Sequence, residues 1–187
     1  MDATLRRRAP VVPADERRSM IVQATLPLLL AHGEMVTTRQ IADAAGIAEG
    51  TIFRVFDDKD AVLLAVLDAV FDPAPFEQAV EAIDPDVPFE PALRTIVELL
   101  QRRSEVIWRV ASSLGPRFHD HARKHLEVSP ALVTFFKRHR GQVTLAPAEA
   151  ARVVRSLTIS VTHPSLVETP MAPKRIVDLF LHGVGSG

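Results

Sequence analysis

The sequence predicts an all-α protein, and three observations lead to that prediction. Apolar residues recur at helical spacing in one segment after another, as Leu93, Ile96, Leu100 and Ile107 do. No stretch shows the strict apolar–polar alternation of a half-buried strand. Residues typical of helix starts and ends separate the segments. We expect a head of three short helices, a fourth connecting helix and a helical C-terminal bundle.

The composition limits the class of protein. The 187 residues are enough to bury a core in one large domain or two small ones. There is no cysteine, which excludes disulfides, thiolate metal sites and cysteine nucleophiles. The basic N-terminus lacks the apolar run of a secretory signal, and no apolar run is long enough to cross a bilayer. We therefore expect a cytoplasmic protein with no membrane partner and no cofactor. The net charge of −1 permits nucleic-acid binding without arguing for it.

The N-terminal third begins with a basic arm over residues 1–14, which contains Arg6, Arg7 and Arg8. A first helix is expected from Asp15 to His32. Pro27 removes one hydrogen bond inside that helix, so we expect a kink or a break there, at a cost on the order of 3 kcal/mol.

Three more helices follow closely. Thr37 and Gln40 form a capping box that opens a helix over residues 38–45. Gly46 is placed as the left-handed residue that closes this helix. A third helix is expected over 49–56, and Asp57 or Asp58 then caps a fourth. The first domain is expected to cover residues 15–58.

The remainder, residues 59–187, is expected to form a second domain with residues 59–71 as its connecting helix. Residues 72–91 hold five prolines and predict a linker with at most one short helix. Amphipathic patterns predict further helices over 93–114, 118–126, 131–139, 147–163 and 173–184.

The spacing of Ala42, Gly46 and Ile52 is typical of a helix-turn-helix. Two helices that cross steeply need a small residue where they touch, a glycine at the bend and a branched apolar side chain on the second helix. In that register the start of the third helix faces outward. A helix start with small side chains can enter a DNA major groove and offer its amides to phosphate.

The stretch "TTRQIADAAGIAEGTIFRVFDDKDAVL", with "MIVQATLPLLLAHG" before it, resembles the DNA-binding signature of TetR-family transcriptional regulators. The resemblance covers about residues 15–65 and is only architectural beyond them. It implies a homodimer that pairs through its last two helices. It also implies a sequence-specific DNA-binding protein, most often a repressor that a small-molecule effector releases from a palindromic operator.

The resemblance also implies the DNA contacts. Thr37, Thr38 and Lys59 would bind phosphate, and Arg39 would reach phosphate or a base. Arg54 would contact guanine or phosphate, and Thr51 a thymine methyl or phosphate. The outward face carried over from the family comprises Ala48, Glu49, Gly50, Thr51, Phe53 and Arg54.

Two positions depart from the family pattern. Phe53 stands where tyrosine is usual, so it offers ring contacts in place of a hydroxyl. Glu49 stands where neutral or positive residues are common, and it would accept from a cytosine amino group or cap the third helix and repel phosphate. Arg6, Arg7 and Arg8 would lie in a minor groove or form a solvated tail.

Three further hypotheses concern the second domain. A small-molecule pocket would be lined by Ser104, Trp108, Ser112, Phe135 and Thr158, with plain core packing as the alternative. A two-fold dimer face would use Val154, Leu157, Val161, Ile176, Val177 and Phe180, with intrachain packing as the alternative. His121 and His125 have metal-binding spacing, but an exposed polar helix without metal explains them as well.

Other functions are less well supported by the sequence. The chain has no phosphate-binding glycine loop, no HExxH helix and no GxSxG elbow, so we do not expect an enzyme. A helical ligand-binding or scaffolding dimer without specific DNA binding remains the alternative, because Phe53 and Glu49 depart from the family pattern.

Overall fold

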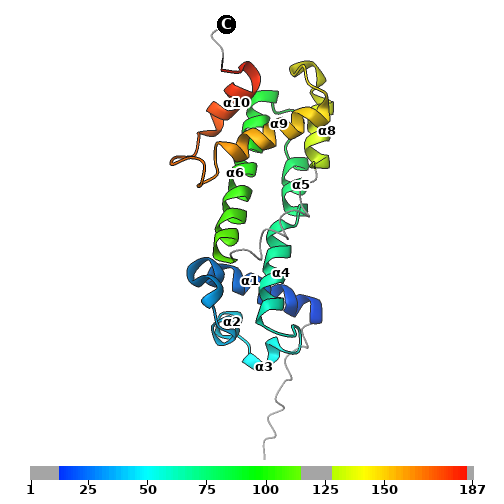
Figure 1. Ribbon diagram of the computed structural model, residues 1–187. Coiled ribbons are helices and arrows are strands. Elements are labelled where there is room, and N and C mark those ends of the chain that lie inside the picture. The colour runs from blue at the N-terminus through cyan, green and yellow to red at the C-terminus, as the bar shows by residue number, and fades with distance from the viewer. Residues whose placement is uncertain (1–12, 115–127, 185–187) are drawn as a thin grey trace, which may run out of the picture. The chain divides into compact units, whose positions relative to one another are not determined.

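A computed structural model describes residues 13–114 and 128–184, and the regular elements in these ranges are all helical (Figure 1). The all-α prediction is therefore confirmed. The chain divides after Ala69 into two compact units, so the boundary falls inside α4 (Lys59–Phe71). The helix expected over 118–126 lies outside the described residues. In the described ranges, no helix combines the length and the apolar character needed to cross a membrane.

The first unit begins with α1 (Ala14–His32) and the short 3-10 turn η1 (Gly33–Met35). The buried residues Ile21, Thr25 and Leu29 are each four positions apart, which places them on one face of α1. Pro27 is exposed, and α1 continues through it to His32. Of the kink or break expected at Pro27, the break therefore does not occur.

The second helix of this unit, α2 (Thr38–Ala45), has capping motifs at both ends. At its start, the Thr37 hydroxyl accepts from the Gln40 amide at 3.2 Å, and the Gln40 side chain accepts from the Thr37 amide at 2.8 Å. At its end, Gly46 adopts φ 66° and ψ 33°. The amide of Gly46 donates to Asp43 and that of Ile47 to Ala42, which is the Schellman motif. Both predictions for α2 are confirmed.

The third helix, α3 (Glu49–Ile52), is shorter than the eight residues expected. Beyond Ile52 the chain continues as hydrogen-bonded turns, with the amides of Val55 and Phe56 both donating to the Ile52 carbonyl. Thr51, Ile52 and Val55 are β-branched, and such residues lose side-chain freedom in a helix. Of the two candidate caps of α4, Asp58 is the one used, since its Oδ1 accepts from the Ala61 amide at 2.7 Å.

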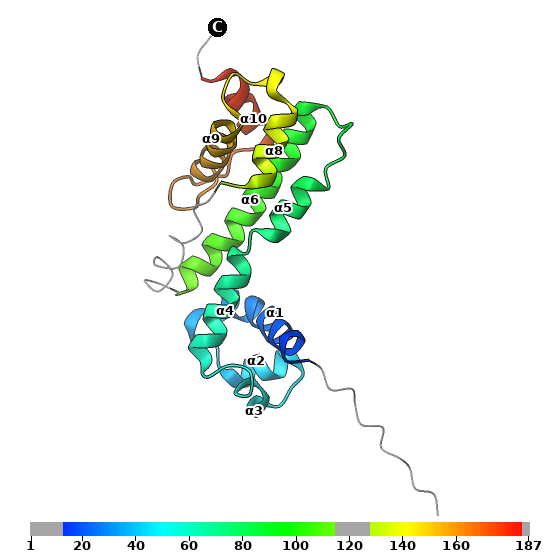
Figure 2. The ribbon, with the colours of Figure 1, turned by 90° about the vertical axis from the view of Figure 1, so that its right-hand side faces the viewer.

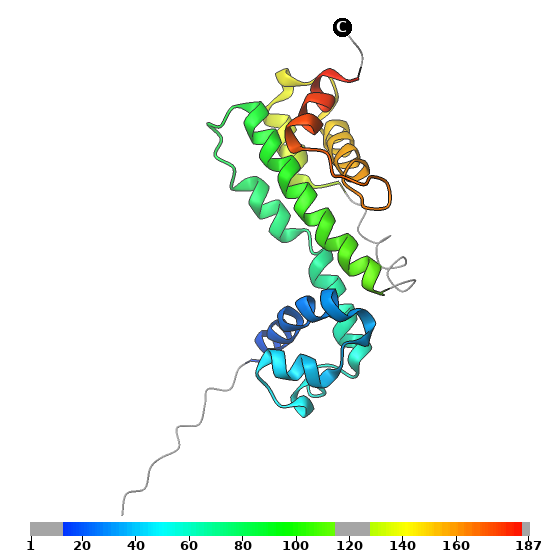
Figure 3. The same ribbon diagram turned by 90° about the vertical axis from the view of Figure 1, so that its left-hand side faces the viewer.

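The second unit is arranged around the long helix α6 (Phe89–Leu114), and α5 (Ala74–Glu81) packs against it (Figure 2). α5 occupies part of the proline-rich segment where at most one short helix was expected. Both α9 and α10 pack against α6 and against each other, and Figure 3 shows them beside its upper half. The remaining elements are α8 (Pro130–Arg138), η3 (Arg140–Gln142), α9 (Pro147–Ser160) and α10 (Pro173–His182).

Helices α6, α8, α9 and α10 share one apolar core. Phe136 on α8 is fully buried, which contributes about 2–3 kcal/mol relative to exposure. Its ring lies 5.3 Å from that of Phe135 and 5.8 Å from that of Phe180. Other members of this core include Leu93, Ile96, Val97, Leu132, Ala150, Val154, Ile176 and Val177.

Candidate nucleic-acid interface and ligand cavity

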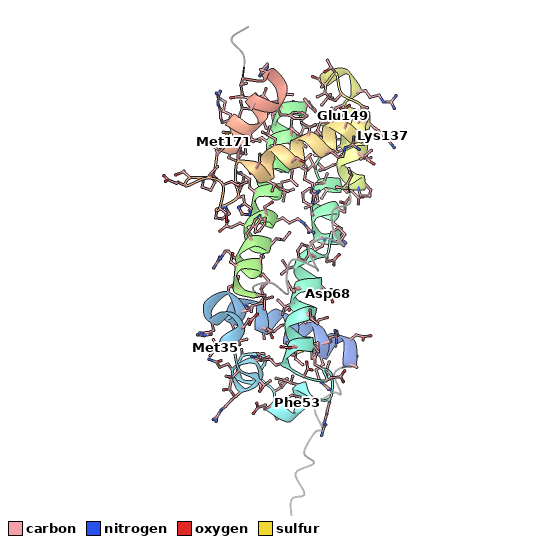
Figure 4. All side chains as sticks on the ribbon, viewed as in Figure 1. Met35, Phe53, Asp68, Lys137, Glu149 and Met171 are labelled. Carbon is pink, nitrogen blue, oxygen red and sulfur yellow. The ribbon has the colours of Figure 1, made fainter. Side chains whose placement is uncertain are left out.

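The outward face predicted for the helix-turn-helix is exposed in the first unit. Ala48, Glu49, Gly50 and Arg54 are exposed, Thr51 is half-buried, and Phe53 keeps 52% of its surface exposed. Phe53 lies at the outer edge of this unit, on the turn that follows α3 (Figure 4). About half of this apolar ring is therefore left accessible for contact with another molecule.

Arg39 and Arg54 are the cations available on this surface. Both are exposed, and neither forms a hydrogen bond or ion pair with the residues that the structure describes. A guanidinium without an intrachain partner can turn its donors toward phosphate or a guanine edge.

Gly50 has no structural requirement to be glycine. A Cβ atom added there would meet no atom within 4 Å, and its backbone is not in the left-handed region. Glycine inside a helix is destabilising by roughly 0.5–1 kcal/mol relative to alanine. The fold alone therefore does not explain why the residue lacks a side chain.

The two helices of the motif are joined by a polar contact that the sequence did not reveal. The Thr38 hydroxyl, on the first turn of α2, donates to Oε1 of Glu49 on the first turn of α3. Thr37 is also engaged, since its hydroxyl belongs to the capping box. Both threonines expected at phosphate thus have intrachain partners in the free chain.

Lys59, also expected at phosphate, is half-buried and donates from Nζ to the backbone carbonyl of Glu34 at 2.8 Å. This bond joins the first residue of α4 to η1. Arg6, Arg7 and Arg8 lie outside the described residues.

The second unit contains a cavity of about 290 Å³. This volume is at the lower end of the range for small-molecule sites. Charged groups of three helices reach it, namely Glu77 of α5, Arg103 of α6 and Arg155 of α9. The remaining described lining includes Phe71, Phe76, Leu100, Ser104, Ile107, Val128, Ser129, Leu132 and Ile159.

The two arginines of the cavity are held in an environment that disfavours charge. Burial lowers the pKa of Arg103, the charge of Asp72 raises it, and the charges of Arg155 and Glu77 act in opposite directions on it. Burial also lowers the pKa of Arg155. Charged groups taken out of water gain most from a partner of opposite sign.

Of the five residues predicted to line a pocket, Ser104 lies on this cavity. The hydroxyl of Thr158 bonds back to the Val154 carbonyl at 2.7 Å, and that of Ser112 to the Trp108 carbonyl at 2.9 Å. The Trp108 ring packs against His163, and Phe135 belongs to the apolar core. The cavity's described lining does not include these four residues.

The predicted dimer-face residues divide into two groups. Val154, Ile176 and Val177 are at most 1% exposed, so the core of the single chain already uses their surface. Leu157, Val161 and Phe180 pack on the edge of that core and keep part of their surface exposed. A further apolar residue of α9, Val153, is 41% exposed.

Glu77, Arg103 and Arg155 are cavity residues that sequence reasoning missed. Arg103 lies at helical spacing between Leu100 and Ile107, where an apolar residue would continue the stripe. Arg155 lies in the same way between Ala151 and Ile159. Glu77 gave no signal, because its segment was interpreted as a linker.

The histidine pair lies outside the described residues, and the described ranges contain no group of three or more side chains suited to a metal ion.

Comparisons with known proteins agree with this architecture. Residues 21–66 match the family model described as "Bacterial regulatory proteins, tetR family". No curated protein sequence matches the chain.

Solved structures resemble the chain over most of its length. The TetR-like regulator LfrR from Mycobacterium smegmatis, solved in complex with proflavine, is 22% identical with a TM-score of 0.59, covering 91% of this chain and 98% of LfrR. A putative TetR-family regulator from Mesorhizobium loti is 15% identical with a TM-score of 0.64, covering 91% and 95%. NalD, the secondary repressor of the MexAB-OprM multidrug efflux pump in Pseudomonas aeruginosa, is 19% identical with a TM-score of 0.52, covering 91% and 98%. At such identities the likeness shows a shared fold.

Proposed function

We propose that this chain, a TetR-family regulator by its matching helix-turn-helix region and its fold, is a repressor that a small molecule releases from a palindromic DNA operator. In this proposal it acts in the cytoplasm and catalyses no reaction. A homodimer would bind the operator, each first unit placing α3 in the major groove of one half-site.

The observation that carries the proposal is the exposed face of α2 and α3. Arg39 and Arg54 have no partner among the described residues, and Gly50 has no internal reason to be glycine. Phe53 adds an exposed ring beside them. The guanidinium groups can donate to phosphates, and the missing side chain at Gly50 lets the DNA backbone come close. The ring of Phe53 can contact thymine methyl groups.

Dimerisation is proposed through the exposed parts of α9 and α10. Leu157 of α9, Val161 at the C-terminal end of α9 and Phe180 of α10 retain exposed apolar surface in the single chain, and Val153 of α9 is exposed as well. Pairing two such helices with their copies across a two-fold axis would bury this surface in a four-helix bundle.

Ligand release is proposed to start in the cavity of the second unit. Its lining is mostly apolar with a few polar groups, as expected of a site for a small organic molecule. A ligand that binds one arrangement of the dimer better than the other shifts the population toward it. LfrR, solved with proflavine, and NalD, named as a repressor, support this proposal by their shared fold.

A footprinting and gel-shift experiment on the DNA flanking the chain's own gene tests the proposal. We expect protection of a palindrome and an affinity that falls steeply with salt concentration. Replacing Arg54 by alanine is expected to cost about 1–3 kcal/mol of operator affinity and to relax selectivity at one base pair. Equal affinity for operator and unrelated DNA would contradict sequence-specific regulation.

The contact between Thr38 and Glu49 favours one alternative function. It places a carboxylate on the surface expected to face phosphate, which suits a helical ligand-binding or scaffolding dimer without specific DNA binding. Unchanged operator binding after both Arg54→Ala and Lys59→Ala would favour that alternative or show that the DNA contacts are wrongly assigned.

A further inference from the structure

The described lining of the cavity of the second unit includes three charged groups, and two of them form hydrogen bonds at helix ends. Arg103 donates from Nη1 to the Asp72 carbonyl at 2.6 Å and from Nη2 to the Phe71 carbonyl at 2.7 Å. These carbonyls lie at the C-terminal end of α4, which carries partial negative charge. Oε2 of Glu77 accepts from the Ala131 amide at 2.6 Å, on the first turn of α8, where a carboxylate is stabilising.

Arg155 is the third charged group of the described lining, and no described residue provides it with such a partner. It forms no hydrogen bond or ion pair with the described residues. The charge of Arg155 lowers the pKa of Arg103, because both side chains are positively charged. A guanidinium that has no partner among the described residues and lies on the wall of an apolar cavity favours a carboxylate or phosphate as its partner.

Glu77 has one carboxylate oxygen still unused. Oε1 is the buried side-chain atom without a hydrogen-bond partner in the described part of the chain. A buried acceptor left without a donor destabilises the folded chain. A ligand group placed against Oε1 therefore has to donate a hydrogen bond, as a hydroxyl does.

The rest of the wall determines what lies between these two polar points. Phe76, Leu100, Ile107, Leu132 and Ile159 line the cavity and offer no hydrogen bond from their side chains. They favour a hydrocarbon body, because the transfer of apolar surface from water into the cavity stabilises the complex.

From this arrangement we infer that the cavity binds an amphipathic organic anion, with its carboxylate on Arg155, its apolar chain against the hydrophobic wall and a hydroxyl donated to Glu77. The three charged side chains of the described lining sum to one positive charge, which favours an anion over a cation of the same shape. The inference rests on the proposed function only in treating this cavity as the effector site.

Four probes that share one eight-carbon chain test the ligand class on the full-length protein without DNA. They are octanoate, 8-hydroxyoctanoate, 1-octanol and octylammonium, each measured by isothermal titration calorimetry. Octanoate is expected to bind more tightly than the neutral alcohol and the cation. 8-Hydroxyoctanoate is expected to bind more tightly than octanoate, because its hydroxyl replaces the missing donor at Glu77.

A pair of variants on α9 tests the residue assignment. Arg155→Gln is expected to weaken octanoate binding about tenfold or more, as the loss of a hydrogen bond to a charged group implies. Arg152→Gln removes the same charge from an exposed position of the same helix that is outside the described lining, and it should leave binding unchanged. Circular dichroism checks that both variants fold. The relative affinities of the four probes for the wild-type protein test the ligand class independently of the variants.

Each outcome separates this inference from the proposed function. Tighter binding of octylammonium, no detectable binding of either carboxylate, or an octanoate affinity unaffected by Arg155→Gln would overturn the anion site. Weaker binding of 8-hydroxyoctanoate than of octanoate would show that Glu77 does not contact the ligand hydroxyl. Operator binding measured in parallel can persist in all these cases. Conversely, carboxylate binding that depends on Arg155 but does not release DNA would uphold the anion site and contradict ligand release.

Discussion

The hydroxyl of Thr38 donates a hydrogen bond to Oε1 of Glu49 and thereby joins the first turns of α2 and α3. The same hydroxyl is the one that the proposed DNA complex would turn toward phosphate. In the proposed complex Glu49 would compete with DNA for this donor and would place a negative charge near the expected backbone path. We therefore expect Glu49 to modulate the affinity for DNA.

Glu49→Gln is expected to raise affinity for operator and unrelated DNA alike by roughly two- to fivefold at low salt, the range for an exposed charge pair. Glutamine keeps an acceptor for Thr38 and removes the charge. Gel shifts measure the change, and Glu90→Gln on α6 controls for the change in net charge. If only operator affinity falls, Glu49 instead accepts from a cytosine amino group.

Gly50→Val is expected to lower operator affinity on the order of tenfold or more, because a side chain would stand where DNA approaches most closely. Helix content and unfolding midpoint should not fall, since the added Cβ has open space and valine has a better helix propensity than glycine. Gly141→Val, at another glycine with open space, is the matched control and should leave DNA binding unchanged. A collapse of the fold in Gly50→Val would contradict the assignment.

Gly46→Val is expected to destabilise the first unit by about 1–3 kcal/mol, because a β-branched residue is strained at φ 66°. No atom lies within 4 Å of the added Cβ, so the expected cost comes from the backbone conformation and not from a clash of that atom. Gly46→Asn should lose less, since asparagine tolerates the left-handed region. Urea midpoints give both values, and equal losses in the two variants would point to a cause other than backbone conformation.

Lys59→Met is expected to weaken binding to any DNA and to reduce the slope of log K against log salt by about 0.9, if one phosphate contact is lost. It also removes the bond to the Glu34 carbonyl, so a small loss of stability should accompany it. Lys137→Met on α8 is the control for lost charge. An unchanged salt slope with lowered stability would show that Lys59 serves only the fold.

The stability of the second unit is expected to decline on acidification through His139. Its ring lies 4.7 Å from that of Phe135 and 5.2 Å from that of Phe89. Burial, and then the charge of Arg138, lower its pKa below the ordinary value of 6.5. The unfolded chain then binds more protons than the folded one, so stability is lost as pH falls through that value. Urea midpoints at about pH 7.5 and pH 5 should differ less in His139→Gln than in the wild type or in His182→Gln.

The capping motifs of the helix-turn-helix could be predicted because the residues that they join are close in the sequence. The capping box joins residues three apart, and the Schellman motif joins Ile47 to Ala42. Such bonds depend on residue type at fixed spacing, which a sequence displays directly. The short extent of α3 was not predicted, because its outward pattern continues beyond Ile52 while its hydrogen bonding changes to turns.

The sequence by itself determined the helical class, the turn at Gly46 and the outward face of α3. Tertiary structure alone decided which polar groups meet: Thr38 and Glu49 are 11 residues apart, Lys59 and Glu34 are 25, Arg103 and Asp72 are 31, and Glu77 and Ala131 are 54. It also decided that Val154, Ile176 and Val177 fill the core of the single chain while Arg155 reaches a cavity. The reason is physical. Helical periodicity shows which residues share a face, but the neighbour of that face depends on how separate helices pack.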